Sequence, residues 1–274
     1  MNASTHAENA ANDIAAHLHP FTNLATHPQL GPLVIQRGDG IFVEDDQGRR
    51  YLEAMSGLWC ASVGFRNARL AKAGSEALHG LPYYHTFNGR SNPAAIALAE
   101  KLLALAPVPM SKVFFANSGS EANDSAVKLV WYYHNAIGKP EKKKIIARRN
   151  AYHGVTVAAA SLSGLAPNHR DFDLPIDRIL HVDCPHHFRY AEAGESEEDF
   201  ATRLAAALEQ RILDEGPETV GAFIAEPVLG TGGITRFLAG PSDLLGWAVA
   251  TATVVAAIVS AWTARRFAKE RQRS

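Results

Sequence analysis

The sequence predicts an α/β fold in which a mostly parallel sheet is flanked by helices. Two observations lead to this prediction: short apolar runs alternate with longer helical patterns, and 47% of the 274 residues are hydrophobic. Strands that alternate with helices need crossover connections, which place the strands parallel and cover both faces of the sheet. The apolar content is sufficient for a core and excludes general disorder.

The expected elements follow in order along the chain. Residues 41–52 predict a strand, a turn and a strand, and residues 94–106 predict a helix, with Pro93 suited to its first turn. The other expected elements are a strand at 113–115, a helix at 121–135, strands at 144–147 and 179–182, a helix at 200–213 and a strand at 221–225.

Composition excludes several classes of protein. The chain has 27 Lys and Arg against 28 Asp and Glu, so its overall charge gives no reason to expect a nucleic-acid partner. Two cysteines, Cys60 and Cys184, cannot form a disulfide framework and favour a reducing, cytoplasmic location. Residues 1–19 lack the apolar segment of a secretory signal.

The composition changes near Ile234. The 19 residues from 244 to 262 carry no charge, and residues 263–274 carry five basic side chains and one acidic one. Such a stretch is long enough for a membrane-crossing helix, and the basic residues after it favour the cytoplasmic side. An apolar helix over 244–262 is therefore expected, either as a membrane contact, as a buried core helix or as part of a tail unrelated to the fold.

Ligands of parallel α/β sheets bind beyond the carboxyl ends of the strands. This rule selects the loop before the 121–135 helix, where Ser118, Gly119 and Ser120 could present free amides and hydroxyls to a phosphate. The alternative is that a serine only caps the helix. The rule also selects Tyr152, which could stack on a flat ring or simply pack, and Glu226, which could orient a bound ring or be an exposed strand-end acid.

Two further clusters have mainly structural interpretations. Ligand-type side chains occur close together at His181, Asp183, Cys184, His186 and His187. No second ligand pair with the spacing of a structural zinc site accompanies them, so no metal is assigned. The basic residues between 142 and 149 are interpreted as a solvated strand entrance.

Taken in order, several segments make the chain resemble the N-terminal part of a class III, pyridoxal-phosphate-dependent aminotransferase, in particular the ω-transaminases. The resembling segments are HLHPFT at 17–22, GDG at 38–40, YLEAMSGLWC at 51–60, LPYY at 81–84, FANSGSEAN at 115–123, YHG at 152–154 and AEPV at 225–228. The resemblance implies the type I pyridoxal-phosphate fold in truncated form. It divides the chain into an N-terminal segment 1–60, a partial cofactor-binding large domain 61–234 and an unrelated tail 235–274.

The resemblance also implies roles for individual residues. The cofactor is pyridoxal 5′-phosphate, and its expected contacts are Ser118, Gly119, Ser120, Tyr152, His153 and Glu226. The substrate pocket is expected to be shaped by Phe21, Leu58, Trp59, Phe87 and Val228. The family reaction moves an amino group from an amine or ω-amino acid to pyruvate, and the family works as a homodimer.

The chain departs from the family pattern at about Thr235. Transamination needs a lysine for the cofactor aldehyde and a carboxylate for the pyridine nitrogen, and the family places both after the segment matching Glu226. The only later lysine here is Lys269, in the basic tail, and nothing places Lys128 at the aldehyde. We therefore expect an inactive, truncated aminotransferase. The alternative is a membrane-anchored, non-enzymatic protein that binds pyridoxal phosphate.

Overall fold

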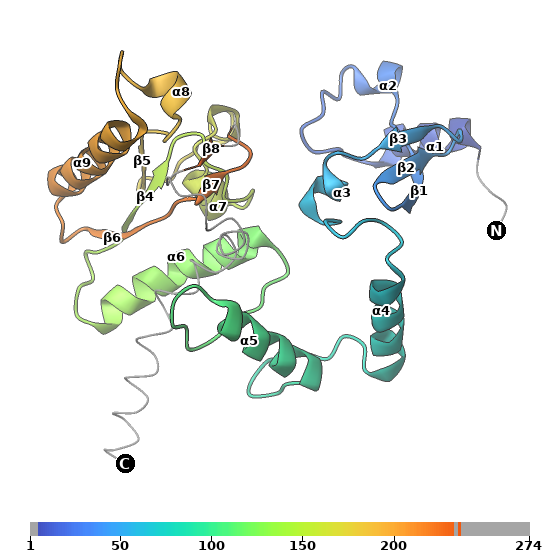
Figure 1. Cartoon of the computed structure of the whole chain (residues 1–274), viewed down its shortest axis with the longest axis horizontal. Helices are drawn as coiled ribbons and strands as arrows, with labels where there is room; N and C mark the ends of the chain where they lie inside the picture. The colour runs from blue at the N-terminus through green and yellow to red at the C-terminus, as the bar shows by residue number, and fades with distance from the viewer. Residues whose placement is uncertain (1–4, 233–234, 237–274) are drawn as a thin grey trace. The chain divides into compact units, whose positions relative to one another are not determined.

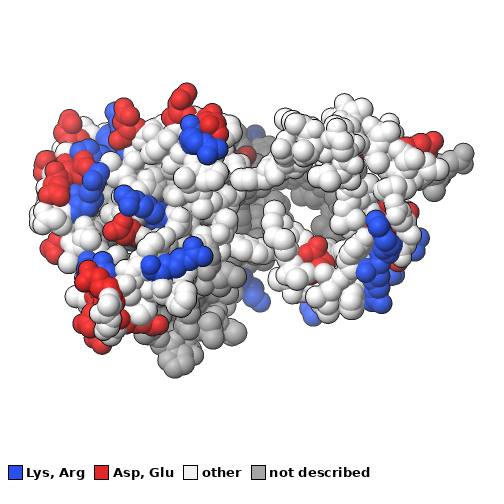
Figure 2. Space-filling view, turned by 90° about the horizontal axis from the view of Figure 1, so that it is seen from above, with Lys and Arg blue, Asp and Glu red and all other residues white. Residues whose placement is uncertain are grey.

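Two units make up the chain in the computed structural model, which describes residues 5–232 and 235–236 (Figure 1). The N-terminal unit comprises residues 1–91 and the C-terminal unit residues 92–274. The sequence-based boundaries at residues 60 and 234 stay predictions. On the face shown in Figure 2, basic and acidic side chains are interspersed over the larger part of the molecule, as the near-zero net charge indicates.

The N-terminal unit is built around a small antiparallel sheet in the order β1-β2-β3. Its elements are α1 (His6–Ala16), α2 (His27–Leu30), β1 (Ile35–Asp39), β2 (Phe42–Asp45), β3 (Arg50–Leu52), α3 (Ser56–Trp59) and α4 (Ala68–Gly80). The turn between β2 and β3 depends on the buried Asp45 carboxylate. It accepts hydrogen bonds from the backbone N–H groups of Gln47 and Arg49 and from the Tyr51 hydroxyl.

The C-terminal unit contains a parallel sheet in the order β5-β4-β6. Its elements are α5 (Pro93–Leu105), α6 (Gly119–Ala136), β4 (Lys144–Arg148), α7 (Val157–Leu162), η1 (Ala166–Asn168), β5 (Ile179–Val182), α8 (His187–Tyr190), α9 (Glu197–Glu215), β6 (Val220–Phe223), β7 (Val228–Leu229) and β8 (Thr235–Arg236). The strands β7 and β8 form a separate antiparallel pair.

The core of this unit lies between the parallel sheet and its helices. Val127 of α6, Ile145 of β4, Leu162 of α7 and Ile179 of β5 form one buried cluster. The chain comes especially close where α6 crosses β6, because a Cβ at Gly221 would lie 3.1 Å from a methyl group of Val130. This packing holds the second half of α6 against the sheet, and the candidate site lies at the start of the same helix.

Most of the expected elements are present. The strands at 144–147, 179–182 and 221–225 are confirmed as three parallel neighbours, and the helices at 94–106, 121–135 and 200–213 are confirmed as α5, α6 and α9. The expected strand at 113–115 is wrong. These residues are irregular, and Phe114 and Phe115 are exposed, so they pair with no strand among the described residues.

The expected apolar helix over 244–262 lies outside the described residues. Within the part of the chain that the structure describes, no helix combines the length and the apolar character needed to cross a membrane.

Candidate functional site

The start of α6 is the first part of the candidate site. Ser118 is its N-cap, and the Ser118 hydroxyl accepts a hydrogen bond of 3.1 Å from the Glu121 backbone N–H. The capping role considered for Ser118 is therefore present. Next to it, a Cβ at Gly119 would meet no atom within 4 Å, so the space beside Gly119 at the start of this 18-residue helix is open, while the Asn117 N–H already donates to the Glu121 carboxylate. Open amides at the positive end of a helix can receive an anion.

The loop 152–154 lies directly against this helix start. Gly154 has φ +133°, and a Cβ there would lie 2.5 Å from the Ser120 Oγ and 3.0 Å from the Ser120 Cα. Only glycine fits this close approach. The Ser120 Oγ accepts a hydrogen bond of 3.0 Å from the Val155 N–H. The two segments, about thirty residues apart in sequence, are therefore joined at the point where the site is expected.

Glu226 joins a third segment to the same place. Its carboxylate accepts hydrogen bonds from the Tyr152 N–H at 2.9 Å and from the Gly230 N–H at 3.1 Å. Burial raises the pKa of Glu226, while these two hydrogen bonds and the Arg148 guanidinium act in the opposite direction. Glu226 is thus a half-buried carboxylate held by backbone groups, which differs from the simple strand-end acid considered as an alternative.

Tyr152 and His153 differ in how far they are exposed to solvent. Tyr152 is 36% exposed, which leaves its ring accessible, whereas His153 is buried. Burial lowers the pKa of His153 to about 4, so its imidazole is neutral at neutral pH. The His153 N–H donates to the Ser163 Oγ at 2.8 Å, and its carbonyl accepts from the Asn123 side chain. Its buried Nε2 has no hydrogen-bond partner among the described residues.

Sequence reasoning missed the role of Asp124 and was wrong about Arg148, which it interpreted as part of a solvated strand entrance. Arg148 is buried at the end of β4 and donates to the Glu226 carbonyl at 3.3 Å, and burial lowers its pKa to about 10. Asp124 of α6 accepts from the Thr156 hydroxyl at 2.8 Å and from the Ala159 N–H at 3.0 Å. An arginine directly after an apolar strand was the available signal for Arg148, since buried charges are rarely incidental.

The residues expected around the substrate are divided between the two units. Phe21, Leu58, Trp59 and Phe87 lie in the N-terminal unit and are exposed. Val228 lies in β7 of the C-terminal unit and is half-buried. Phe21, Leu58 and Trp59 have φ values of 51°, 57° and 69°, an unusual backbone region for such side chains. Four of these five residues therefore belong to one unit, and Val228 belongs to the other.

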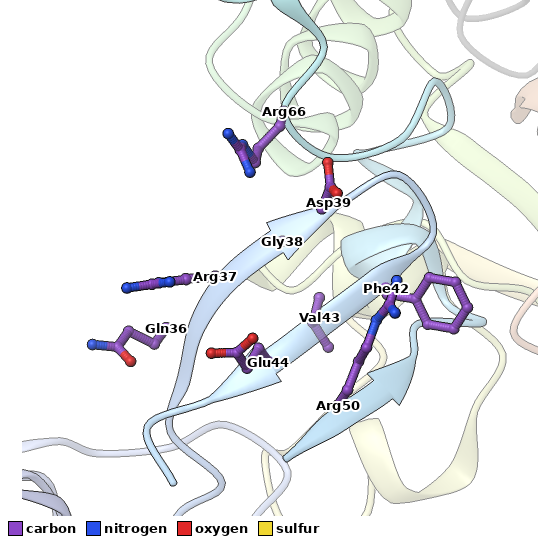
Figure 3. A pocket seen from close by; sticks show the side chains of 9 residues that line it. All are labelled: Gln36, Arg37, Gly38, Asp39, Phe42, Val43, Glu44, Arg50 and Arg66. Carbon is purple, nitrogen blue, oxygen red and sulfur yellow. The ribbon is translucent and has the colours of Figure 1, made fainter. Parts of the chain in front are cut away.

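A hollow in the N-terminal unit is separate from these residues (Figure 3). It is lined by Gln36, Arg37, Gly38, Asp39, Phe42, Val43, Glu44, Arg50 and Arg66. The Arg50 guanidinium carbon lies 3.9 Å from the centroid of the Phe42 ring. None of the residues expected at the cofactor or the substrate lines this hollow, and its charged side chains are of both signs.

The geometry defines an α/β protein whose parallel sheet holds an open helix start, an accessible aromatic ring and a half-buried carboxylate close together. A family model described as "Aminotransferase class-III" matches residues 24–240. The chain therefore belongs to the class III aminotransferase family, as its resemblance implies. Proteins of this family depend on pyridoxal phosphate and act on amine and keto acid substrates.

Individual relatives agree with this assignment. The chain is 55% identical over 218 residues to gamma-aminobutyrate transaminase 1, mitochondrial, of Oryza sativa subsp. indica, which covers 79% of this chain and 42% of the relative. It is 52% identical over 229 residues to vanillin aminotransferase of Capsicum chinense, and these residues cover 82% of this chain and 50% of the relative.

Solved structures give the same result. The omega transaminase from Pseudomonas jessenii in complex with PMP matches with a TM-score of 0.82 and 59% identity, over 85% of this chain and 51% of that one. The chain therefore spans about half the length of the relatives it matches.

Proposed function

We propose that this chain forms the phosphate-binding and ring-binding part of a pyridoxal-phosphate site, in an aminotransferase of the type that moves an amino group from an amine or ω-amino acid to pyruvate. The observation that carries the proposal is a pair of hydrogen bonds. One joins Val155 to Ser120, and the other joins Tyr152 to Glu226. Together they support the proposal, because they connect the helix start and the carboxylate to the backbone of segment 152–155, which carries the Tyr152 ring.

The residues present fit this cofactor. The space beside Gly119 is open at the positive end of α6, which suits a phosphate group. Tyr152 offers an accessible ring beside it, and Glu226 offers a carboxylate that two backbone N–H groups already orient. When bound, the cofactor supplies the electron sink for amino-group transfer, and the protein supplies binding and orientation.

Each residue then has a distinct role in the proposed site. Gly119 and Ser120, with Ser118 nearby, bind the phosphate. Tyr152 stacks on the pyridine ring. Glu226 positions polar substituents of the ring. His153 lies beside Tyr152 as a neutral imidazole, because burial keeps its pKa at about 4, and so adds no positive charge to the site at neutral pH.

We further propose that the 274-residue chain does not turn over substrate by itself. The chemistry needs a lysine amine to hold the cofactor and move a proton at the substrate carbon. Lys128 is exposed on α6, and Lys269 lies outside the described residues. Among the described contacts, none joins Lys128 to the proposed site.

Cofactor binding by the purified chain tests the first proposal. We expect saturable binding of pyridoxal phosphate by equilibrium dialysis, at least tenfold weaker binding of pyridoxal, and at least tenfold weaker binding of pyridoxal phosphate by the Tyr152→Ala variant. Phe188→Ala is the matched control, because Phe188 is a 92% exposed aromatic residue of the same unit. Equal binding of pyridoxal and pyridoxal phosphate would contradict the phosphate role of the α6 start.

Turnover is a separate measurement. Formation of alanine from pyruvate and an amine donor should stay at the level of a protein-free control containing pyridoxal phosphate. Turnover by the purified chain would refute inactivity while leaving the cofactor site intact. Borohydride reduction with peptide mapping would then identify the lysine involved.

The alternative function is a membrane-anchored protein that binds pyridoxal phosphate without turnover. It is supported by the uncharged sequence 244–262 and loses this support if alkaline washing releases the protein from membranes.

A homodimer follows from the family and is proposed here on the exposed apolar side chains of the N-terminal unit, including Phe21 and Phe87. The cytoplasmic location stays a prediction from cysteine content.

A further inference from the structure

A cluster of imidazoles surrounds one carboxylate in the N-terminal unit, outside the proposed cofactor site. Asp13 lies in the last turn of α1, His17 is the residue that caps this helix, and His19 follows in the connection to α2. His27 is the first residue of α2. All four residues belong to the same unit, whose elements are shown in Figure 1.

The ligand-type atoms of these residues are close together. The Asp13 Oδ1 lies 3.1 Å from the His17 Nδ1, and the Asp13 Oδ2 lies 2.8 Å from the His19 Nε2. One ligand atom from each of Asp13, His17 and His19 lies within 4.8 Å of the other two. The His17 and His19 rings have centroids 4.1 Å apart. Among the described residues, no other group of three such side chains is this close.

The carboxylate at the centre is held by hydrogen bonds. Asp13 is partly buried, with 19% of its side chain exposed, and its Oδ2 lies 2.8 Å from the His19 Nε2. His27 contacts the same oxygen from the other element, with its Nε2 at 3.2 Å from the Asp13 Oδ2. His27 therefore holds the carboxylate in place without belonging to the closest group.

We propose that Asp13, His17 and His19 bind a divalent transition-metal ion, Zn²⁺ being the best match, with water completing the coordination and His27 positioning Asp13. Two imidazole nitrogens and one carboxylate oxygen are a donor set that zinc uses in open sites. Imidazole nitrogen disfavours Mg²⁺ and Ca²⁺, which prefer oxygen ligands. No hydrogen bond or ion pair to a group outside the cluster occupies the ligand atoms among the described contacts.

The observed spacing is close to what metal binding requires. Ligand atoms about 2.1 Å from a tetrahedral ion are roughly 3.4 Å from one another. The two nitrogen–oxygen distances, 2.8 Å to the Asp13 Oδ2 and 3.1 Å to the Asp13 Oδ1, are each somewhat shorter than this and run to different oxygens, so the carboxylate would turn one oxygen towards the ion as the ion replaces the two hydrogen bonds. The exposed His17 gives the ion a route from solvent, because 61% of its side chain is accessible.

Metal binding would fix a segment that also carries a proposed substrate residue. His17 and His19 immediately precede Phe21, whose backbone has φ 51°. The ion would tie the end of α1 to residues 17–19 and so limit the conformations open to residues 19–22. The proposed metal is structural in this sense. Its presence does not depend on whether the chain binds pyridoxal phosphate.

Metal titration of the full chain, prepared without a polyhistidine tag and dialysed against a chelator, tests the proposal. We expect one equivalent of Co²⁺ to give the visible absorption of a tetrahedral site, and Zn²⁺ to displace it. His17→Gln and Asp13→Asn should each weaken Zn²⁺ binding at least 100-fold in competition with a chromophoric chelator. His27→Gln should weaken it about tenfold, because residues that orient a ligand matter less than the ligand itself.

His6→Gln is the matched control. His6 is also a histidine of α1 bound to a carboxylate, with its Nδ1 at 2.7 Å from the Asp46 Oδ1, but the remaining partner of Asp46 is the Asn9 amide. This variant should bind Zn²⁺ within twofold of the parent chain. The absence of saturable Co²⁺ and Zn²⁺ binding below 100 µM would overturn the proposal, as would equal loss in His6→Gln. Because His17 is exposed, its variant is expected to keep the parent circular dichroism spectrum.

Discussion

The two units differ in how many of their apolar side chains are buried. In the described part of the N-terminal unit, Val43 is the only buried hydrophobic residue, while Phe21, Tyr83 and Phe87 are each more than 75% exposed. In the described part of the C-terminal unit, fourteen hydrophobic residues are buried, most of them in or beside the parallel sheet. A sheet covered by helices makes its own core, whereas a small sheet needs a hydrophobic face or a packed helix to be stable alone.

Polar groups hold the N-terminal unit together to an unusual degree. Asp45 fixes the β2–β3 turn, and Asp13 connects the end of α1 to His19 and His27. The exposed aromatic residues add nothing to this unit alone. We therefore infer that the C-terminal unit is stabilised mainly by the hydrophobic side chains that it buries. The exposed apolar side chains of the N-terminal unit are suited to contact with another protein surface.

Replacing a core residue of the parallel sheet should have the largest effect. Ile146 of β4 is fully buried, so Ile146→Ala removes apolar contacts and leaves a cavity, at a cost of about 2–5 kcal/mol. Ile41→Ala in the N-terminal unit changes a residue that is 60% exposed and should cost no more than about 0.5 kcal/mol. Hydrogen exchange of the β4 and β2 amides measures the two local opening free energies. Similar costs at Ile146 and Ile41 would refute the contrast between the units.

Acid should weaken the two units in different pH ranges. The buried His153 has a folded-state pKa of about 4, against about 6.5 when unfolded. The unfolded state therefore binds a proton first, and the C-terminal unit should lose about 3 kcal/mol as the pH falls from about 6.5 to about 4. In the N-terminal unit, desolvation raises the pKa of Asp45, but the hydrogen bonds that Arg49 donates outweigh this effect and the pKa is lowered to about 2. Its contribution is complete above about pH 4 and is lost only as the pH falls towards 2.

The pH contrast is measurable with one variant. Urea unfolding at pH 7 and pH 5 should show a loss of stability in the parent chain that is smaller in His153→Gln, because glutamine does not titrate at this position, whereas His181, whose pKa burial also lowers, is present in both proteins. An NMR titration of the imidazole signals, assigned with the same variant, should place the His153 pKa near 4. Equal pH dependence in both proteins would show that His153 does not set the acid sensitivity of this unit.

The sequence predicted well what depends on local pattern and less well what depends on pairing. The apolar runs at 144–147 and 179–182 became β4 and β5 because buried parallel strands are continuously hydrophobic. The run at 113–115 is just as apolar, but it pairs with no strand in the part of the chain that the structure describes. The polar strand β1 was missed, because its ladder with β2 depends on backbone groups that composition does not reveal.

The candidate site shows the same limit. The small-residue loop at 118–120 and the strand-end acid Glu226 were recognisable as positions for a ligand. The hydrogen bond from Tyr152 to Glu226 spans 74 residues, and the buried Arg148 and Asn123 contacts depend on how the segments pack. Residues that support a site through tertiary contacts have no spacing rule, so only the folded arrangement identifies them.

Self-association should distinguish the apolar surfaces of the two units. The double variant Tyr83→Ser/Phe87→Ser removes two aromatic rings that are 95% and 79% exposed in the N-terminal unit. If this surface pairs two copies of the chain, the dimerisation constant measured by analytical ultracentrifugation should weaken at least tenfold. Phe188→Ser in the C-terminal unit removes an equally exposed ring and should change it less than twofold. A monomeric parent chain, or equal effects of both changes, would contradict a dimer formed through the N-terminal surface.

Helix capping should give the smallest and most local effect. Asn67 caps α4 by accepting from the Arg69 and Leu70 N–H groups, and Ser196 caps α9 by accepting from the Asp199 N–H. Replacing either by alanine removes about 1 kcal/mol. α4 has no buried side chain, so the loss should accelerate hydrogen exchange about fivefold along the whole helix. α9 packs on β5 and buries Phe200, so only its first turn should exchange faster in Ser196→Ala. Faster exchange throughout α9 would mean that the C-terminal unit holds this helix no more firmly than the N-terminal unit holds α4.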